Sequence, residues 1–445
     1  MTVPKLIELL QQWQGNPAIA SVRIEFGDGS IYHHPANDNL RQNSPKGAPD
    51  RTSKLRKIGP AILLFLSLAS SPIAFGQSVS VAPKLKWQPV IENTSVDVDE
   101  VFPAEILAVA GRHVQQKTPP RYLGDPNGAL GIVLVSSMAD VSVHVSIKVD
   151  RLAEESGFDA TIPEANQPYE IWPTIRFDTR TLARIRESFP TTALFSVSVN
   201  GVTAGEQSRT IQVRSVNDVP FAYVTKDRRV LDVSPLFAAF VDENNPYIDR
   251  ILHEALRVNV VQRFMGYQGS PQDVIREVFA IWNVMQRQGV KYSSITTPSG
   301  ESRSAMSQHV RFLDEAVQNS QANCADGSVL FASILYKLGI YPVLVKVPGH
   351  MFLGFYTDSQ RQQISFLETT MLGEPGLNNV QRNWTFKTVE GYLSSESYRQ
   401  FVNALNEGQA KFQQAAPRFQ AKTPGYLLID IQAARRAGIS AIARF

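Results

Sequence analysis

The spacing of the apolar residues changes near residue 220, and this change constrains the fold more than any other feature of the sequence. Before it, residues 141–149 alternate strictly between apolar and polar types, as expected for a strand with one solvent-exposed face. After it, residues 245–265, 273–288 and 311–318 carry apolar side chains at intervals of three and four, the period of a helix. The sequence therefore predicts a multidomain protein, with a strand-rich domain followed by a domain that contains helices.

The first domain is predicted to be an all-β sandwich over residues 79–215. Four runs rich in β-branched residues are expected to form strands, at 129–135, 141–149, 194–199 and 210–213. The pair Asn200-Gly201 is typical of a tight hairpin turn. His144 falls on the polar side of its alternating strand, so we expect it to face solvent. Several strands without helical periodicity favour a sandwich.

The domain boundary is predicted near residues 216–225, where Asn217-Asp218-Val219-Pro220 interrupts the periodic pattern. The second domain then spans residues 221–445 and is expected to fold by itself. Trp282 lies within the apolar stripe of a predicted helix, and we expect it in the core.

An apolar segment at residues 58–76 follows the basic residues 54–57 and precedes a polar stretch. This order is typical of a signal peptide, here with cleavage after Gly76, and an uncleaved membrane anchor of the inner membrane is the alternative. The serines, prolines and glycines within the segment favour cleavage. Both interpretations place residues 77–445 outside the cytoplasm, in the periplasm or another extracytoplasmic space, with membrane attachment through residues 58–76 in the second.

The 57 residues before this segment form a prefix longer than the basic region of an ordinary signal peptide. Either translation starts downstream, or residues 1–57 are a small cytoplasmic appendage. Residues 4–13 could form a helix, and residues 20–26 and 30–34 alternate like a hairpin. His33 and His34 near its end are expected to be solvated rather than to bind metal.

Composition excludes several classes of function. Residues 1–76 carry eight basic and five acidic side chains of the 44 and 41 in the chain, which leaves 36 of each in residues 77–445. A neutral body lacks the basic excess of a nucleic-acid-binding surface, so no nucleic-acid partner is expected. The single cysteine excludes internal disulfides and multi-cysteine metal sites, and the seven histidines form no helical metal pair. No metal or organic cofactor is expected.

The single cysteine, Cys324, stands at the predicted start of a helix that ends at Gly339. Asn323 is suited to cap this helix, and Asp326 complements its positive end. A thiol in the first turn faces that positive end, which favours the thiolate. Backbone N–H groups there, and the side chains of Asn323 or Gln308, are candidate donors to an oxyanion, although capping and surface roles are favoured for these two side chains.

Two further polar residues follow at the ends of predicted strands. The strand at 341–347 leads through Pro348-Gly349 to His350 and the strand 351–356, and the strand 364–367 leads to Glu368. Neighbouring antiparallel strands bring such residues within hydrogen-bonding reach. A base beside the thiol, oriented by a carboxylate, is the general arrangement of an activated nucleophile.

Residues 272–370 resemble the transglutaminase-like, papain-related thiol fold in the order of their motifs. The matching positions are Trp282, Val290-Lys291-Tyr292, Cys324, Leu338-Gly339-Ile340, Pro342, Gly349-His350 and Glu368-Thr369-Thr370. Residues 426–439 are similar to the tail of bacterial members. The chain departs from the family pattern at Glu368, where the acid is commonly Asp, and at Met351-Phe352 after the histidine. The resemblance implies an α+β domain and a Cys324-His350-Glu368 triad.

The resemblance also implies the class of reaction. We expect an exported thiol enzyme that acts on amide or peptide bonds of a protein or peptide substrate in the cell envelope, by acyl transfer through Cys324, His350 and Glu368. Protease, deamidase and cross-linking activities all remain open, because members of this fold differ in substrate. The alternative is a non-catalytic binding or assembly protein of the envelope that uses the thiol fold as a scaffold.

Overall fold

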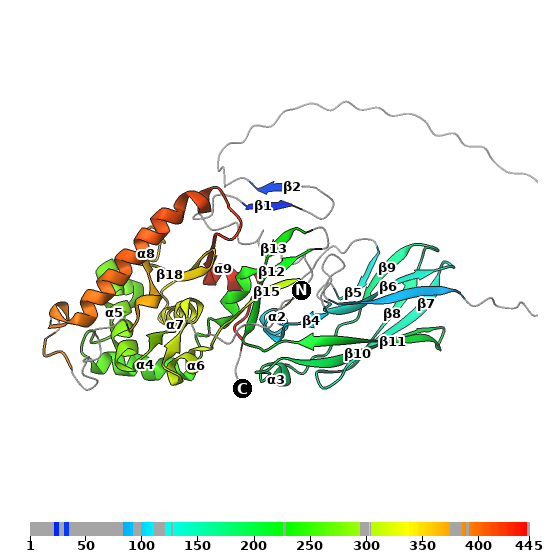
Figure 1. Ribbon diagram of the computed structural model, residues 1–445, viewed down its shortest axis with the longest axis horizontal. Helices are drawn as coiled ribbons and strands as arrows, with labels where there is room; N and C mark the ends of the chain where they lie inside the picture. The colour runs from blue at the N-terminus through cyan, green and yellow to red at the C-terminus, as the bar shows by residue number, and fades with distance from the viewer. Residues whose placement is uncertain are drawn as a thin grey trace, which may run out of the picture.

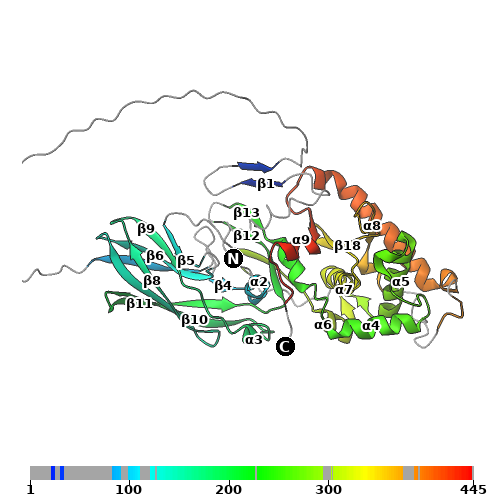
Figure 2. The same ribbon diagram turned by 180° about the vertical axis from the view of Figure 1, so that it is seen from behind.

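The computed structural model describes residues 83–91, 99–110, 121–125, 128–225, 228–293, 302, 304–373, 385–388 and 391–442, and the backbone of 22–25 and 31–34. The chain is a mixed α/β protein with several sheets. Its strand-rich part and its helix-rich part lie at opposite ends in both views (Figure 1, Figure 2). The predicted signal or anchor at 58–76 lies outside the described residues. No helix within the described ranges is long and apolar enough to cross a membrane.

Two sheets form the strand-rich part. The first has the order β4-β11-β10-β7-β8 and the second the order β3-β6-β9-β5. Alternate residues of both sheets, among them Val145 and Phe195 of the first and Ile132 of the second, belong to one buried apolar core. The strands are β3 (Leu85–Ile91), β4 (Glu100–Val101), β5 (Tyr122–Gly124), β6 (Leu130–Ser136), β7 (Val141–Val149), β8 (Ala153–Ile162), β9 (Pro168–Trp172), β10 (Phe189–Val199) and β11 (Val202–Val213).

Two local predictions for the strand-rich part, a strand and a hairpin turn, agree with the structure. The strand predicted at 141–149 is confirmed as β7, and His144 is exposed with its Nδ1 2.7 Å from Asp159 Oδ1. The two-residue hairpin turn is confirmed too, because Asn200 and Gly201 both have positive φ, 50° and 78°, between paired Val199 and Val202. The all-β description omits two short helices, α2 (Pro103–Val109) and α3 (Thr179–Leu182).

In the prefix, β1 (Val22–Glu25) pairs in antiparallel fashion with β2 (Ile31–His34), as the alternation predicted. The helix suggested for residues 4–13 and the side chains of His33 and His34 lie outside the described residues.

The helix-rich part is built on an antiparallel sheet with the order β19-β18-β17-β20. Side chains of β18 alternate between its two faces. Leu353 and Phe355 face the large core that contains α7, whereas Phe352 faces a second cluster with Phe412 of α8. The strands are β17 (Pro342–Val347), β18 (His350–Tyr356), β19 (Ile364–Leu367) and β20 (Leu427–Asp430). The helix α7 and the second half of α8 therefore cover opposite faces of the sheet.

The remaining elements surround this sheet, and Figure 1 shows α8 as a long helix beside α5. Trp282 of α5 is fully buried, as predicted. Two small sheets, β13-β12-β15 and β14-β16, complete the helix-rich part.

The helices are α4 (Pro246–Arg257), α5 (Pro271–Arg287), α6 (Leu313–Gln318), α7 (Cys324–Lys337), α8 (Glu396–Gln420) and α9 (Ile431–Arg436). The small-sheet strands are β12 (Asp218–Val224), β13 (Val230–Asp232), β14 (Lys291–Tyr292), β15 (Ala305–His309) and β16 (Gln321–Ala322). The 3-10 helices are η2 (Ser234–Phe240), η3 (Gly266–Gln268), η4 (Thr369–Met371) and η5 (Gly391–Ser394).

The short helix α2 joins the two parts of the chain. Phe102 and Ala108, at its two ends, are fully buried in the same core as the helices of the second part. The Tyr223 hydroxyl donates to Glu105 Oε2 at 2.6 Å, and Ser440 N donates to Ala108 O at 2.8 Å. The boundary near 216–225 stays a prediction, but residues 221–445 alone would lack this segment of their core.

We expect Phe102→Ala to lower the free energy of unfolding by about 3–5 kcal/mol, because it leaves a cavity between α2 and the second part. Denaturant unfolding monitored by Trp fluorescence would measure this change. Val202→Ala, at a side chain 71% exposed at a hairpin tip, is the control and should change the value by less than about 0.5 kcal/mol. Equal effects of the two substitutions would contradict the shared core.

Candidate active site

Cys324 is the first residue of α7, as the sequence predicted, and a reciprocal cap fixes it there. Asp326 N donates to Asn323 Oδ1 at 2.8 Å, and Asn323 N donates to Asp326 Oδ2 at 2.9 Å. Asp326 is fully buried and also accepts hydrogen bonds from Arg311 N and Nη1, at 2.7 and 2.8 Å. The helix-start role predicted for Asp326 is confirmed, and Asp326 additionally ties the segment before α6 to the cysteine.

A short parallel pairing holds the residues that precede the cysteine. Lys291 and Tyr292 of β14 pair with Gln321 and Ala322 of β16, two residues before Cys324. Burial raises the pKa of Tyr292 above its usual value, and the neighbouring charges of Cys324 and Glu368 raise it further. The sequence marked Tyr292 only as part of a strand motif, and the structure adds its electrostatic interaction with Cys324 and Glu368.

A tight turn sets the position of His350. Pro348 and Gly349 connect β17 to β18, and Val347 pairs with His350 across the turn. Gly349 has a φ of 72°, which suits the glycine position of a turn that begins with proline. His350 is thereby the first residue of β18, and its side chain is 24% exposed.

Glu368 follows the last residue of β19 and is almost completely buried, with 1% of its side chain exposed. Its Oε2 lies 2.7 Å from His350 Nε2 and 2.7 Å from Lys411 Nζ. Its Oε1 accepts hydrogen bonds from Thr370 N at 3.1 Å and Thr370 Oγ1 at 2.6 Å. Burial opposes ionisation of this carboxyl, but the hydrogen bonds from His350, Lys411 and Thr370 outweigh it and lower the pKa to about 2. Glu368 is therefore an ionised carboxylate at neutral pH.

The imidazole of His350 connects the carboxylate to the cysteine. A hydrogen bond with the side chain of Cys324 is the largest cause that raises the pKa of His350 to about 9, and the hydrogen bond with Glu368 is the next. Cys324 itself is a free, half-buried cysteine. The structure thus brings together the three side chains selected from the sequence, in the order thiol, imidazole, carboxylate.

The long helix α8 supplies Lys411, which no motif of the sequence indicated. Glu368 N donates to Ala404 O of this helix at 3.0 Å. Gly408 lets the helix lie directly on β19, because a Cβ at this position would come within 2.8 Å of Leu367 N. Apolar residues at 401, 404, 412 and 415 have helical spacing and were an available signal for α8.

The two candidate oxyanion donors differ in their surroundings. Asn323 Nδ2 is buried and, within the described part of the chain, has no hydrogen-bond partner. Gln308 Nε2 donates to His309 O at 3.0 Å on β15. Asn323 therefore has an uncommitted N–H₂ group one residue from the cysteine, whereas the amide of Gln308 is engaged.

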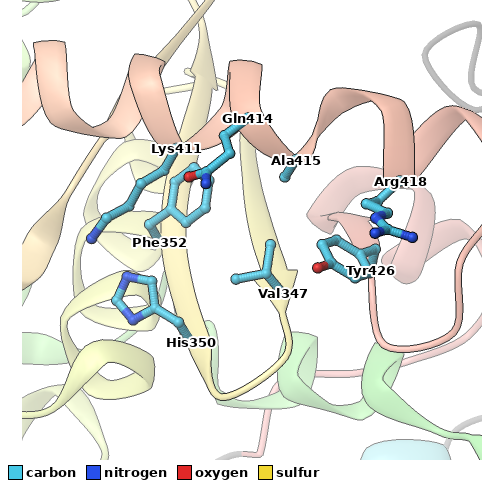
Figure 3. A pocket seen from close by; sticks show the side chains of 8 residues that line it. All are labelled: Val347, His350, Phe352, Lys411, Gln414, Ala415, Arg418 and Tyr426. Carbon is cyan, nitrogen blue, oxygen red and sulfur yellow. The ribbon is translucent and has the colours of Figure 1, made fainter.

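A cavity of about 610 Å³ lies between the β17–β18 hairpin and α8, and His350 forms part of its wall (Figure 3). We call it the His350 pocket. Cys324 is not among the residues that line it, so the pocket extends from the imidazole and does not enclose the sulfur. Its lining residues are Val347, His350, Phe352, Lys411, Gln414, Ala415, Arg418 and Tyr426.

Comparison with known proteins does not assign this chain to a family. No protein-family model matches the chain, and no curated protein matches it in sequence. Among the residues that the structure describes, no group of three or more His, Cys, Asp or Glu side chains could hold a metal ion. Any functional conclusion for this site depends on the contacts of Cys324, His350 and Glu368 themselves.

The pKa values of His350 and Glu368 predict how the pair contributes to stability at different pH. A histidine whose pKa rises from 6.5 to about 9 on folding stabilises the protein fully below pH 6.5, and this contribution is lost as the pH rises through about 9. A glutamate whose pKa falls from 4.5 to about 2 stabilises the protein above pH 4.5, and this contribution is lost as the pH falls through about 2. The pair should stabilise most between pH 4.5 and 6.5.

Denaturant unfolding of the wild type and of His350→Gln over a pH series would measure this contribution. The loss of unfolding free energy in His350→Gln should be largest near pH 5.5 and shrink towards pH 9.5, because the wild-type imidazole then loses its proton. His253→Gln, at an exposed histidine of α4, is the control and should show a smaller dependence. A loss that grows with pH would show that His350 is not held as the cation.

Proposed function

We propose that this chain is a thiol-dependent acyl-transfer enzyme with a transglutaminase-like, papain-related domain that acts on amide or peptide bonds. The observation that carries the proposal is the His350 imidazole, whose Nε2 lies 2.7 Å from Oε2 of the buried Glu368 carboxylate and whose pKa is raised most of all by the neighbouring side chain of Cys324. A nucleophile, a base and a group that orients the base are the parts that covalent acyl transfer needs.

In the proposed first step, the Cys324 sulfur attacks the carbonyl carbon of a carboxamide or peptide bond. A C–S bond forms, and the carbonyl π electrons move to the oxygen. Backbone N–H groups at the start of α7 and the uncommitted amide of Asn323 are the candidate donors to this oxyanion. The tetrahedral intermediate collapses, the C–N bond breaks, and His350 gives its proton to the leaving amine or ammonia.

In the second step, water or a primary amine attacks the thioester carbonyl. His350, now neutral, accepts the proton of the attacking group, the C–S bond breaks, and the Cys324 thiolate leaves. Glu368 remains ionised throughout and keeps the imidazole in one orientation, a role supported by its four hydrogen bonds. Attack by water gives hydrolysis or deamidation, and attack by a lysine amine gives cross-linking.

The proposed location is the cell envelope. It rests on the basic residues and apolar segment at 54–76, and it makes envelope proteins and peptides the proposed substrates. A non-catalytic scaffold is the rival function, and it predicts an unreactive thiol.

Alkylation by iodoacetamide tests the proposed triad without knowledge of the substrate. The rate for Cys324 should depend on the presence of the His350 imidazole, because a neighbouring imidazolium favours the reactive thiolate. His350→Ala should slow alkylation at about pH 6.5 by about tenfold or more, and Glu368→Gln should slow it less, because it perturbs orientation without removal of the imidazole. Mass spectrometry of the modified peptide would measure each rate.

Two variants control this experiment. Cys324→Ser should abolish labelling while the protein remains folded, and His253→Ala should alkylate like the wild type. A rate that rises with pH as for an ordinary thiol and is the same in His350→Ala would contradict the triad and favour the scaffold.

A further inference from the structure

The His350 pocket combines a cationic side with an apolar wall. Lys411, Gln414 and Arg418 lie three and four residues apart on α8, so they share one face of the helix. In Figure 3 they project along the pocket, with Lys411 near His350 and Arg418 near Tyr426 at the far end. The apolar contacts come from the opposite side, at Val347, Phe352 and the ring of Tyr426. No acidic side chain is among the residues that line the pocket.

The two cationic side chains that α8 contributes to the pocket, Lys411 and Arg418, differ in whether they already bind a carboxylate of the protein. Lys411 Nζ binds Glu368 Oε2 at 2.7 Å and lies 3.6 Å from Glu407 Oε1. The guanidinium of Arg418 makes no hydrogen bond and no ion pair with any residue that the structure describes, and Arg418 is exposed. Arg418 is therefore available for a ligand at the end of the pocket distant from His350.

We propose that the His350 pocket is a subsite for a carboxylate carried by the acyl-transfer substrate, and that Arg418 binds this carboxylate. The inference rests on the proposed function and names the substrate class for that site. The planar guanidinium offers parallel N–H donors that match the two oxygens of a carboxylate. The apolar wall suits the methylene stem that would connect such a group to a peptide backbone.

The length of the pocket sets where the carboxylate lies in the substrate. Arg418 follows Lys411 by seven positions on α8, a rise of about 10 Å along the helix. Lys411 contacts the carboxylate that holds His350, so a distance of about 10 Å from this end of the pocket to Arg418 corresponds to about three residues of an extended peptide. The carboxylate then belongs to a residue near the reactive bond, as an acidic side chain or as the C-terminal α-carboxylate.

The charges around the His350 pocket exclude a preference for a cationic group of the substrate. Lys411, Arg418 and the protonated ring of His350 all face the pocket, and the Glu368 carboxylate beneath them is buried and already bonded to two of these groups. A substrate that carried a cation in this pocket would meet the same charge on two sides.

Three peptide alkylating reagents test the inference through the rate at which they modify Cys324. Iodoacetyl-Gly-Glu amide has a side-chain carboxylate, iodoacetyl-Gly-Gln acid has an α-carboxylate, and iodoacetyl-Gly-Gln amide has neither. In each reaction the sulfur forms a C–S bond and iodide leaves. We expect one of the two carboxylates to increase the second-order rate constant of the wild type by about three- to tenfold over the neutral reagent, as expected for one charge-assisted hydrogen-bonded pair. The faster one identifies the source of the carboxylate.

Variants of Arg418 and one matched control assign the preference to this residue. Arg418→Gln should reduce the rate ratio of charged to neutral reagent to about one, Arg418→Glu should bring it below one, and Arg418→Lys should keep part of it. Arg399→Gln, at an exposed arginine of α8 outside the pocket, should leave the ratio at the wild-type value. Equal rates for the three reagents with the wild type, or a preference that persists in Arg418→Gln, would overturn the inference.

The same experiment separates this inference from the proposed function. Equal rates in a protein whose iodoacetamide reaction depends on His350 would refute the carboxylate subsite alone. No reaction of Cys324 with any reagent, iodoacetamide included, would refute both.

Discussion

The buried carboxylate of Glu368 is the interaction on which the rest of the site depends. An ionised group with 1% of its surface exposed is costly in a folded protein unless hydrogen bonds and opposite charges compensate it. Here the compensation comes from three separate elements, through His350 of β18, Thr370 of η4 and Lys411 of α8. Loss of any one partner removes a hydrogen bond from this buried charge, so the carboxylate couples the orientation of the imidazole to the packing of the helix that covers it.

The layers of the helix-rich part explain how these side chains meet. The helix α7 presents Cys324 at its first turn and packs on one face of the sheet, while the second half of α8 packs on the other. His350 lies at the end of the sheet, where a tight turn begins β18. The neighbouring side chain of Cys324 raises the pKa of this ring, and the His350 pocket extends from the ring towards α8 (Figure 3).

Local signals explain why much of this site could be predicted from the sequence. Cys324 follows a capping residue, His350 follows Pro348-Gly349, and Glu368 ends a short apolar strand, so each stands at an element terminus that a few neighbouring residues define. The strands β17 and β19 and the helix α7 were predicted to within two residues at each end for the same reason.

The parts that could not be predicted depend on contacts between distant residues. The helix predicted at 245–265 ends as α4 at Arg257, and Asn259 adopts a left-handed conformation with a φ of 63° that stops it. The role of α2 depends on a core that Phe102, Ala104 and Ala108 share with residues from Val216 to Ile442, far along the chain. The sequence of α8 is rich in Gln and Asn and includes Gly408 and Pro417, which weaken the helical signal, so Lys411 and Arg418 were not selected.

Direct observation of the protonation state of His350 tests the account most directly. In protein with ¹³C-labelled histidine, the ring Cε1–H signal of His350, assigned by its absence in His350→Gln, can be followed from about pH 5 to pH 10. The account predicts that this ring stays protonated through neutral pH and loses its proton near pH 9. Deprotonation of His350 near pH 6.5, the ordinary histidine value, would contradict the interaction of the imidazole with Cys324 and Glu368 on which the proposed chemistry depends.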